Sequence, residues 1–303
     1  EIHLNSYMKK CLVVTCGFFG DIIFASSLAE KLKQEKGYES VDYLIGFPQM
    51  ETLVRNNPFI DNVFVSEHPN ATPTSKEVNT GEYEKVYQLQ PLSFKITPCE
   101  EFQQLADLSK ISSEYRVYTQ QEYDIIAEQL INDLKQEHKK PVVAVMSNWQ
   151  SKTYIFTPEQ YIAGVDVPGL GYGGAHRNVQ EIVEGLSDSF TLLQVGAGNL
   201  SQIQTANTPD HDTKSLLFEA SLIKYCDAFI GTDGGLATIA AGVGTKTVLT
   251  GDFNLQLYGW NGVIKKIEQP RLGPYEYFGA PHIVLDPYLT DTQVISQIIS
   301  ELL

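Results

Sequence analysis

The sequence is poor in cysteine and in positive charge, and each shortage argues against a class of protein. Its four cysteines, which form no CxxC pair, are Cys11, Cys16, Cys99 and Cys226. We therefore expect reduced, buried thiols and neither disulfides nor a zinc site. The chain carries 37 acidic and 22 basic residues, a formal net charge of −15. This charge argues against broad binding to nucleic acid or to an anionic membrane surface.

Long apolar runs are missing as well. No stretch approaches the roughly 20 apolar residues that span a bilayer as a helix. The first residues, EIHLNSY, lack the basic and then apolar layout of a signal peptide. We therefore expect a cytoplasmic protein, and we leave residues 1–7 out of the fold prediction.

Apolar runs alternate with helical patterns through the first half of the chain. The 303 residues suit two globular domains of roughly 150 residues each. Continuous apolar runs predict parallel strands that are covered on both faces, with helices between them. The predicted strands are 9–16, 40–47, 61–67 and 85–90, and the predicted helices are 21–36, 49–57 and 120–138. The pattern is loose from 69 to 120.

The second half repeats the alternation. Its predicted strands are 142–147, 190–198, 228–232 and 246–251, and its predicted helices are 157–165, 178–188, 213–226, 236–244 and 290–303. Strand and helix in alternation are typical of doubly wound α/β domains with right-handed crossovers. We predict two Rossmann-like domains, 8–140 and 141–289, followed by a C-terminal helix, 290–303.

The segment DAFIGTDGGLATIAAGVG, 227–244, is the strongest candidate for a binding site. A predicted strand ends at Thr232 and Asp233, and Gly234 and Gly235 lead into a helix of small residues. Free amides and the positive end of the dipole make such a helix start suitable for a phosphate. The alternative is an ordinary strand-to-helix turn that Asp233 caps.

A second candidate is VAVMSNWQSKTYIFTPEQY, 143–161. The predicted strand ends at Ser147 and Asn148, and Lys152 follows on a loop. A lysine beyond the carboxyl end of a parallel strand can reach a ligand in an interdomain crevice. Taken alone, Lys152 is more simply a solvated surface charge.

The third candidate is CGFFGDIIFASSLAEKLK, 16–33, where Asp21 stands before an apolar helix start. The preceding turn contains Gly17, Phe18 and Gly20. A carboxylate at this place is either a helix cap or first-turn acid that the dipole favours, or a functional acid.

Together these segments resemble the lipopolysaccharide heptosyltransferase family, glycosyltransferase family 9, which has the two-domain GT-B fold. The run VDYLIGFPQMETLVRNNPFIDNVF, 41–64, is similar to the family's strand, short helix and Asn-Pro before a third strand. Lys152 ahead of TPEQY matches the family's donor lysine. Asp233, Gly234, Gly235 and Leu236 match its DSG or DTG turn. The resemblance covers most of the chain outside 69–120.

The resemblance implies two Rossmann-like domains that face a central cleft, the first for the acceptor and the second for a nucleotide-diphospho-sugar. It implies inverting, metal-independent transfer of a heptose-like or other sugar, with Asp21 as general base and Gly17, Phe18 and Gly20 as the acceptor-side loop. Apolar neighbours would raise the pKa of Asp21 and make it a better base.

The donor side, on this resemblance, binds an ADP-, GDP- or UDP-linked sugar and needs no metal or other cofactor. Its residues are Ser147, Asn148, Lys152, Thr232, Asp233, Gly234, Gly235, Leu236 and Thr238. We read PDHDT, 209–213, as a polar loop and not a metal site. The fold also allows the last helix to cross back to the first domain.

Two departures from the family leave other functions open. Thr238 stands where the family often has a histidine. The turn after the strand 190–198 offers only Asn199 and Ser201 where the family commonly has an acid that holds the ribose. These departures favour a degenerate nucleotide-sugar-binding protein without transferase activity, and a nucleotide-sugar epimerase is a third possibility.

On this resemblance the acceptor would be a glycan or another hydroxyl compound, and we expect residues 69–120 to select it. We expect no stable contact with nucleic acid or membrane-spanning segment. The protein would lie at the inner membrane only if the acceptor is a lipid-linked glycan.

Overall fold

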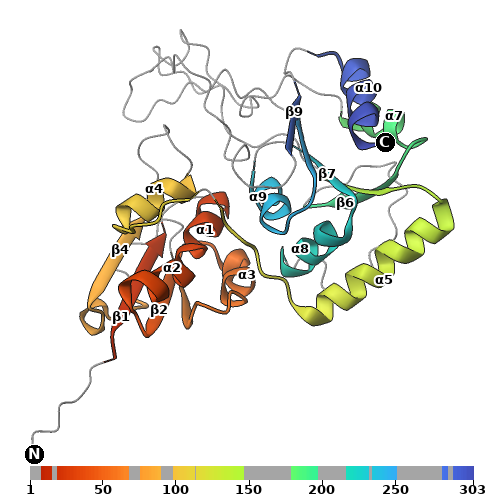
Figure 1. Ribbon diagram of the computed structural model, residues 1–303. Helices are drawn as coiled ribbons and strands as arrows, with labels where there is room; N and C mark the ends of the chain where they lie inside the picture. Colours follow the sequence, from red (N-terminus) through yellow and green to blue (C-terminus); the bar gives the residue numbers. More distant parts are fainter. Residues whose placement is uncertain are drawn as a thin grey trace, which may run out of the picture. The chain divides into compact units, whose positions relative to one another are not determined.

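The chain forms two compact units in a computed structural model (Figure 1). One unit contains residues 1–120 with Ser215–Leu217, and the other contains Gln121–Lys214 with Phe218–Leu303. The structure describes residues 8–15, 19–67, 76–89, 98–112, 114–146, 179–196, 216–231, 234–250, 282–285 and 289–303.

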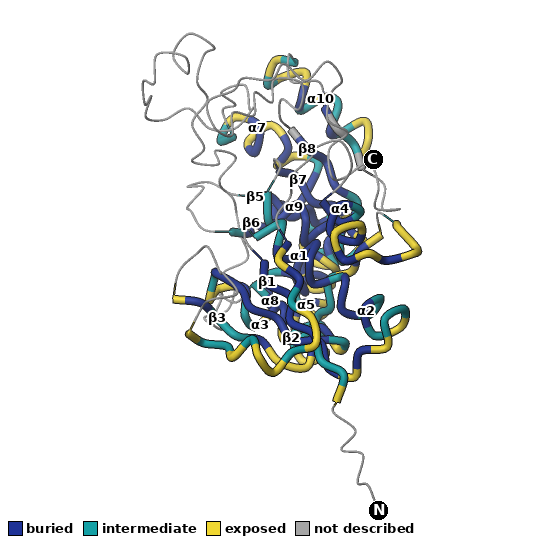
Figure 2. The backbone as a smooth tube through the Cα atoms, turned by 90° about the vertical axis from the view of Figure 1, so that its left-hand side faces the viewer, coloured by how far each residue is buried: buried dark blue, intermediate teal, exposed yellow. Residues whose placement is uncertain are grey.

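The first unit is built on a four-stranded parallel sheet with the strand order β3-β2-β1-β4. Its strands are β1 (Lys10–Thr15), β2 (Ser40–Ile45), β3 (Asn62–Val65) and β4 (Lys85–Leu89). Its helices are α1 (Phe19–Ser26), α2 (Leu28–Lys36), α3 (Glu51–Arg55) and α4 (Pro98–Leu105), with 3-10 turns η1 (Pro48–Met50) and η2 (Thr80–Glu82). The two central strands, β1 and β2, are buried almost throughout (Figure 2), and β2 buries the polar residues Ser40 and Asp42 along with its apolar ones.

The predicted helix 21–36 is divided into α1 and α2 at Ser27. The Ser26 hydroxyl donates to the carbonyl of Ile23 at 2.8 Å, and the Ser27 hydroxyl donates to the carbonyl of Phe24 at 2.7 Å. Serine hydroxyls that bond to the preceding turn compete with regular helix, so the break follows from this pair of serines. Helix α4 was not predicted, because it lies in the loosely patterned stretch.

The second unit is built on a five-stranded parallel sheet with the strand order β6-β5-β7-β8-β9. Its strands are β5 (Val142–Met146), β6 (Thr191–Val195), β7 (Ala228–Gly231), β8 (Thr247–Thr250) and β9 (His282–Leu285). Its helices are α5 (Gln121–His138), α7 (Val179–Leu186), α8 (Leu216–Tyr225), α9 (Gly235–Gly242) and α10 (Asp291–Leu302). The first four strands were predicted and β9 was not. The predicted helix 157–165 lies outside the described residues.

Helix α5 belongs to the second unit, although the sequence suggested a boundary after residue 140. Its Asp124 accepts hydrogen bonds from the Ser221 hydroxyl at 2.8 Å and from the Lys224 ammonium at 2.6 Å. Near its other end, Lys135 pairs with Asp227 at 2.7 Å. These partners stand roughly a hundred residues away along the chain, so the linear pattern did not show the attachment.

Helix α10 packs against α7 in the second unit. Its Val294 and Ile298 are fully buried in one cluster with Ile182 and Leu186 of α7. The helix begins with a capping box, in which the Thr290 hydroxyl accepts from the amide of Gln293 at 3.3 Å. These contacts fix the last helix to its own unit.

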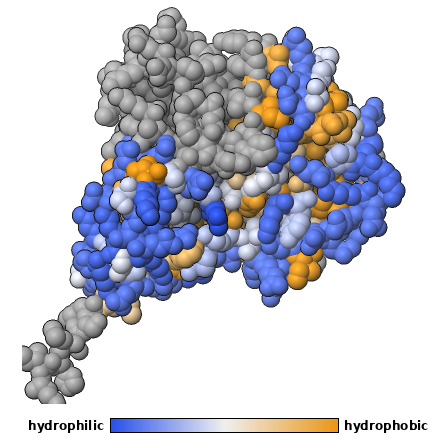
Figure 3. Space-filling view, in the orientation of Figure 1, coloured by the Kyte–Doolittle hydropathy of each residue, from blue (hydrophilic) through white to orange (hydrophobic). Residues whose placement is uncertain are grey.

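The face shown in Figure 3 is mainly hydrophilic where the structure describes it, with separate hydrophobic groups. Within the described residues, no helix combines the length and the apolar character that crossing a membrane would require.

Candidate functional site

Both sheets contain a topological switch point. From β1 the chain adds β2 on one side of the strand and β4 on the other, and from β5 it adds β6 on one side and β7 on the other. In parallel α/β sheets, ligands bind outside the carboxyl ends of the strands at such a point. Two edges are therefore candidates, one after β1 and β4 and one after β5 and β7.

Asp21 lies at the first of these edges. It stands in the first turn of α1, half-buried, and the buried residues Ile22, Ile23 and Phe24 follow it. In this position the carboxylate interacts favourably with the positive end of the helix dipole. The same position places it near the carboxyl end of the central strand. Gly20 is in the same turn. Gly17 and Phe18, the rest of the predicted acceptor-side loop, lie outside the described residues.

The strand that leads to Asp21 ends in a buried hydroxyl. Thr15 is fully buried, and its Oγ1 has no hydrogen-bond partner within the part of the chain that the structure describes. A buried hydroxyl without a partner costs free energy of folding. Sequence reasoning did not select Thr15, because a threonine at the end of an apolar strand is common.

The second edge brings together two segments that stand about 85 residues apart. β5 and β7 are neighbours, with Val145 paired to Ile230. A Cβ built on Gly231 would lie 3.0 Å from the Cβ of Met146, and one on Gly234 would lie 3.9 Å from its Cε. The predicted donor residues Ser147, Asn148 and Lys152 follow Met146, and Thr232 and Asp233 stand between the two glycines, but these five lie outside the described residues.

Helix α9 begins at this edge. Gly234 precedes it in extended conformation, and Gly235 and Leu236 form its first turn. The first amides of a helix have no acceptor within the helix, and the positive end of the dipole lies there. Gly234, Gly235 and Leu236 are thus the residues of the predicted phosphate turn that the structure describes.

Thr238 is placed differently from the other predicted donor residues. It is 2% exposed, and its hydroxyl donates to the carbonyl of Gly234 at 3.1 Å. A hydroxyl has one proton, so Thr238 cannot donate to a phosphate oxygen while it makes this bond. In this geometry Thr238 tightens the first turn of α9.

Glu219 is a residue near the same edge that sequence reasoning missed. It lies in the first turn of α8 and accepts a hydrogen bond from the amide of Gly196, which directly follows β6, at 2.8 Å. Burial raises the pKa of Glu219, and the bond from Gly196 opposes this shift. No local signal marks Glu219, because it stands within a helical pattern 23 residues from its partner.

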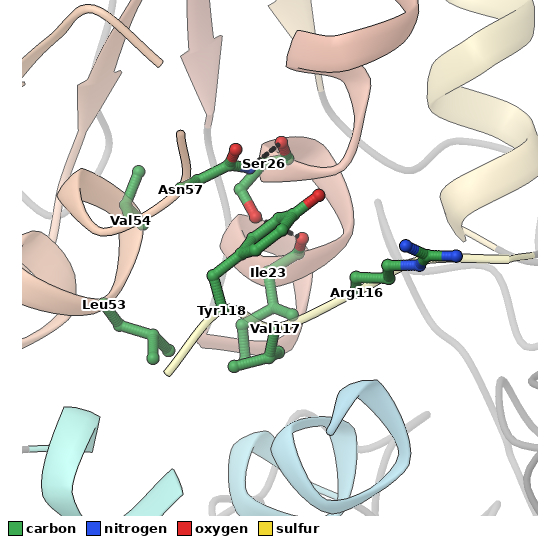
Figure 4. A pocket seen from close by; sticks show the side chains of 8 residues that line it. All are labelled: Ile23, Ser26, Leu53, Val54, Asn57, Arg116, Val117 and Tyr118. Carbon is green, nitrogen blue, oxygen red and sulfur yellow. Dashed lines mark hydrogen bonds between the residues drawn. The ribbon is translucent and has the colours of Figure 1, made fainter. Parts of the chain in front are cut away.

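A shallow hollow in the first unit is lined by α1, α3 and the segment after α4 (Figure 4). Its empty volume is about 230 Å³, and this value includes space that is open to solvent. Two of its polar groups bond within the fold: Asn57 donates to the carbonyl of Ser26 at 2.9 Å, and the Ser26 hydroxyl donates to the carbonyl of Ile23 at 2.8 Å. Its lining residues are Ile23, Ser26, Leu53, Val54, Asn57, Arg116, Val117 and Tyr118. We do not place a reaction there.

Metal-binding groups do not gather anywhere in the described parts of the chain: no cluster of three or more His, Cys, Asp or Glu side chains occurs there. The segment 209–213 lies outside them.

Several solved structures are similar to this chain, among them the following three. The family 9 glycosyltransferase of Veillonella parvula has a TM-score of 0.59 at 13% identity, over 97% of both chains. The ADP-heptose lipopolysaccharide heptosyltransferase II of E. coli has a TM-score of 0.52 at 14% identity, over 97% of this chain and 98% of the other. The iron-containing heptosyltransferase TibC, solved in complex with ADP-D-β-D-heptose, has a TM-score of 0.52 at 14% identity, over 98% of this chain and 77% of its own.

These likenesses confirm the predicted fold, a GT-B architecture of two Rossmann-like domains like that of family 9 structures. No protein-family model and no curated protein matches the sequence.

Proposed function

We propose that this protein is an inverting, metal-independent glycosyltransferase. It would move a sugar from a nucleotide-diphospho-sugar to an acceptor hydroxyl. The observation that carries the proposal is the second switch point, where the segments after Met146 and after Gly231 start side by side. The sequence indicates a phosphate site at Gly234 and Gly235, and a lysine, Lys152, that can reach a ligand. A family 9 glycosyltransferase among the fold neighbours supports the same reading, as does the heptosyltransferase TibC, which is solved with ADP-D-β-D-heptose.

The proposed reaction needs a base and a stabilised leaving group. Asp21 removes the proton of the acceptor hydroxyl, whose oxygen forms a bond to the anomeric carbon. The bond from that carbon to the phosphate oxygen breaks, and the nucleoside diphosphate leaves with the electron pair. Lys152 and the first amides of α9 stabilise the negative charge that grows on the phosphate. Attack from the face opposite the leaving group inverts the anomeric centre.

A cytoplasmic location belongs to the proposal. Cys11, Cys99 and Cys226 are free, buried thiols, as is usual in a reducing compartment.

Binding of nucleoside diphosphates tests the donor half. We expect one member of a panel of ADP, GDP, UDP, CDP and TDP to raise the melting temperature without added metal. A ligand at 100 times its Kd adds about 2.7 kcal/mol of stability. The variant Lys152→Ala should lose this effect. Lys140→Ala is the matched control, since Lys140 stands just before β5 and donates to the carbonyl of Ser187 at 3.0 Å.

The outcome of this binding experiment distinguishes a glycosyltransferase from a degenerate nucleotide-sugar-binding protein. If no diphosphate stabilises the protein, or only a metal-dependent effect appears, the transferase proposal is wrong. If binding occurs but no sugar is transferred or hydrolysed, the degenerate binding protein is the better description. An epimerase would convert the nucleotide sugar without any acceptor, so an assay that contains the donor alone identifies it.

A further inference from the structure

Two aromatic side chains meet at the edge of the first sheet where Asp21 stands. Phe19 is the first residue of α1, two residues before Asp21, and Phe47 stands two residues after the end of β2. The two strand ends are neighbours, since Thr15 pairs with Ile45. The ring centroids of Phe19 and Phe47 lie 5.3 Å apart, with 79° between the ring planes, which is an edge-to-face contact.

The backbone holds Phe47 in place. Phe47 is extended and directly precedes η1, and its carbonyl accepts a hydrogen bond from the amide of Met50 at 3.0 Å. Pro48 begins that turn and restricts its backbone. Both Phe19 and Phe47 are half-buried, so the aromatic pair remains partly accessible to solvent. An aromatic surface that is already ordered loses little conformational entropy when a ligand binds to it.

The charges at this edge are negative. Among the described residues that follow β1, β2 and β3 (19–21, 46–49 and 66–67), the charged ones are Asp21 and Glu67, and none is basic. An anionic ligand that approached these residues would be repelled by the two carboxylates. The edge therefore suits an uncharged ligand that has an apolar surface.

An uncharged sugar ring is a ligand of this kind. In many sugars one face of the ring presents C–H groups, whose small positive charge is attracted to the negative face of an aromatic ring. The hydroxyls stand around the rim of the ring, where a carboxylate can accept a proton from one of them.

We propose that the acceptor is an uncharged sugar, and that Phe19 and Phe47 bind the apolar face of its ring while Asp21 takes the proton of its hydroxyl. The proposal deepens the proposed function and rests on it. It names the class of acceptor and two residues that position it.

The test uses two probes, methyl β-D-glucopyranoside and methyl β-D-glucuronopyranoside, which share one ring and differ by a carboxylate. Saturation-transfer NMR titrations measure their binding to the full chain. We expect the glucoside to bind roughly tenfold more tightly than the glucuronide. Phe47→Leu, which keeps an apolar side chain and loses the ring, should weaken glucoside binding about three- to tenfold. Phe47→Tyr keeps the ring and should bind like wild type.

A second aromatic pair supplies the matched control. Phe59 is also half-buried and makes an edge-to-face contact with Tyr118, at 6.2 Å between ring centroids. Phe59→Leu should therefore leave the binding of both glycosides unchanged.

Three results overturn the inference. If the glucuronide binds as tightly as the glucoside, or if neither glycoside binds, the class of acceptor is wrong. If Phe47→Leu lowers the melting temperature but leaves glucoside binding unchanged, the aromatic pair only supports the fold. The diphosphate panel is measured separately. A protein that binds a diphosphate and fails the glycoside tests contradicts this inference alone, whereas one that binds no diphosphate contradicts the proposed function.

Discussion

Asp21 has two explanations at the scale of the single residue, and its position in α1 satisfies both. The general-base role predicts that Asp21→Asn lowers sugar transfer by about 10²- to 10⁴-fold while nucleotide binding stays the same. Glu30→Gln is the matched control, because Glu30 is the first-turn acid of the next helix. Product formation and calorimetric binding measure the two effects. Full turnover by Asp21→Asn would leave only the helix-dipole role.

The buried hydroxyl of Thr15 predicts an unusual stabilising substitution. Thr15→Val replaces the hydroxyl by a methyl group of similar shape, so the cost of burying a polar group without a partner disappears. We expect the free energy of unfolding to rise by about 1 kcal/mol in urea titrations. Thr247→Val should lower it, because the Thr247 hydroxyl donates to the carbonyl of Thr245 at 2.9 Å. Equal losses in both variants would show that Thr15 has a partner in the folded protein.

Glu219 should make stability depend on pH. Burial raises its pKa in the folded protein, so folding favours the protonated form. The contribution of Glu219 to the free energy of unfolding is therefore highest below the unfolded pKa and decreases as pH rises through the raised pKa. Glu219→Gln should remove this decrease in unfolding titrations between about pH 4 and pH 8. The exposed-site variant Glu184→Gln should retain it, and a Glu219→Gln profile that matches wild type would contradict the prediction.

At the scale of the element, the end of β7 requires a residue without a side chain. A Cβ on Gly231 would lie 2.9 Å from two ring atoms of the buried Phe229 and 3.0 Å from the Cβ of Met146. We expect Gly231→Ala to lower the free energy of unfolding by about 1–3 kcal/mol, as overpacking of a core does. Gly234→Ala should cost less, since its Cβ would meet only the Cε of Met146 at 3.9 Å. Thermal unfolding of both variants decides the order, and equal melting temperatures would refute it.

Elements were predicted well where the sequence repeats a local pattern. Eight strands follow from mainly apolar segments, because a strand covered on both faces is mostly apolar. The break at Ser27 escaped this reasoning, since it depends on where two hydroxyls bond. Helix α4 and strand β9 escaped it because neither stands in a clear alternation.

Some residues of the candidate site can be predicted from the sequence, and others cannot. Asp21 and the turn at Gly234 are visible in sequence, because each directly follows an apolar strand. The partnership of Glu219 with Gly196 is not visible, because it depends on how α8 packs beside the end of β6. Thr238 was predicted as a phosphate ligand from its position alone, and its bond to Gly234 depends on the rotamer.

At the scale of the whole molecule, α5 determines where the chain can be divided. A fragment of residues 121–303 retains α5, with its buried Ala127, Ile131 and Leu134. A fragment of residues 141–303 loses them and leaves Asp227 without Lys135. We expect the longer fragment to melt at the higher temperature, because the shorter one exposes the apolar surface that α5 covers. Circular dichroism on heating measures the melting temperatures of the two fragments. Equal melting temperatures would favour a domain boundary at residue 140.

The packing of α10 on α7 also has a consequence for the order in which the protein folds during synthesis. The core of the second unit includes Val294 and Ile298, which are translated long after the strands they cover. The ribosome adds residues at roughly 5–20 per second, and domains generally fold as they emerge. The sheet of the first unit is complete by Leu89 and can close early. The core of the second unit is complete only when its last helix has been synthesised, and until then its apolar surface is exposed. We therefore expect chaperones to bind this half of the nascent chain in preference to the first half.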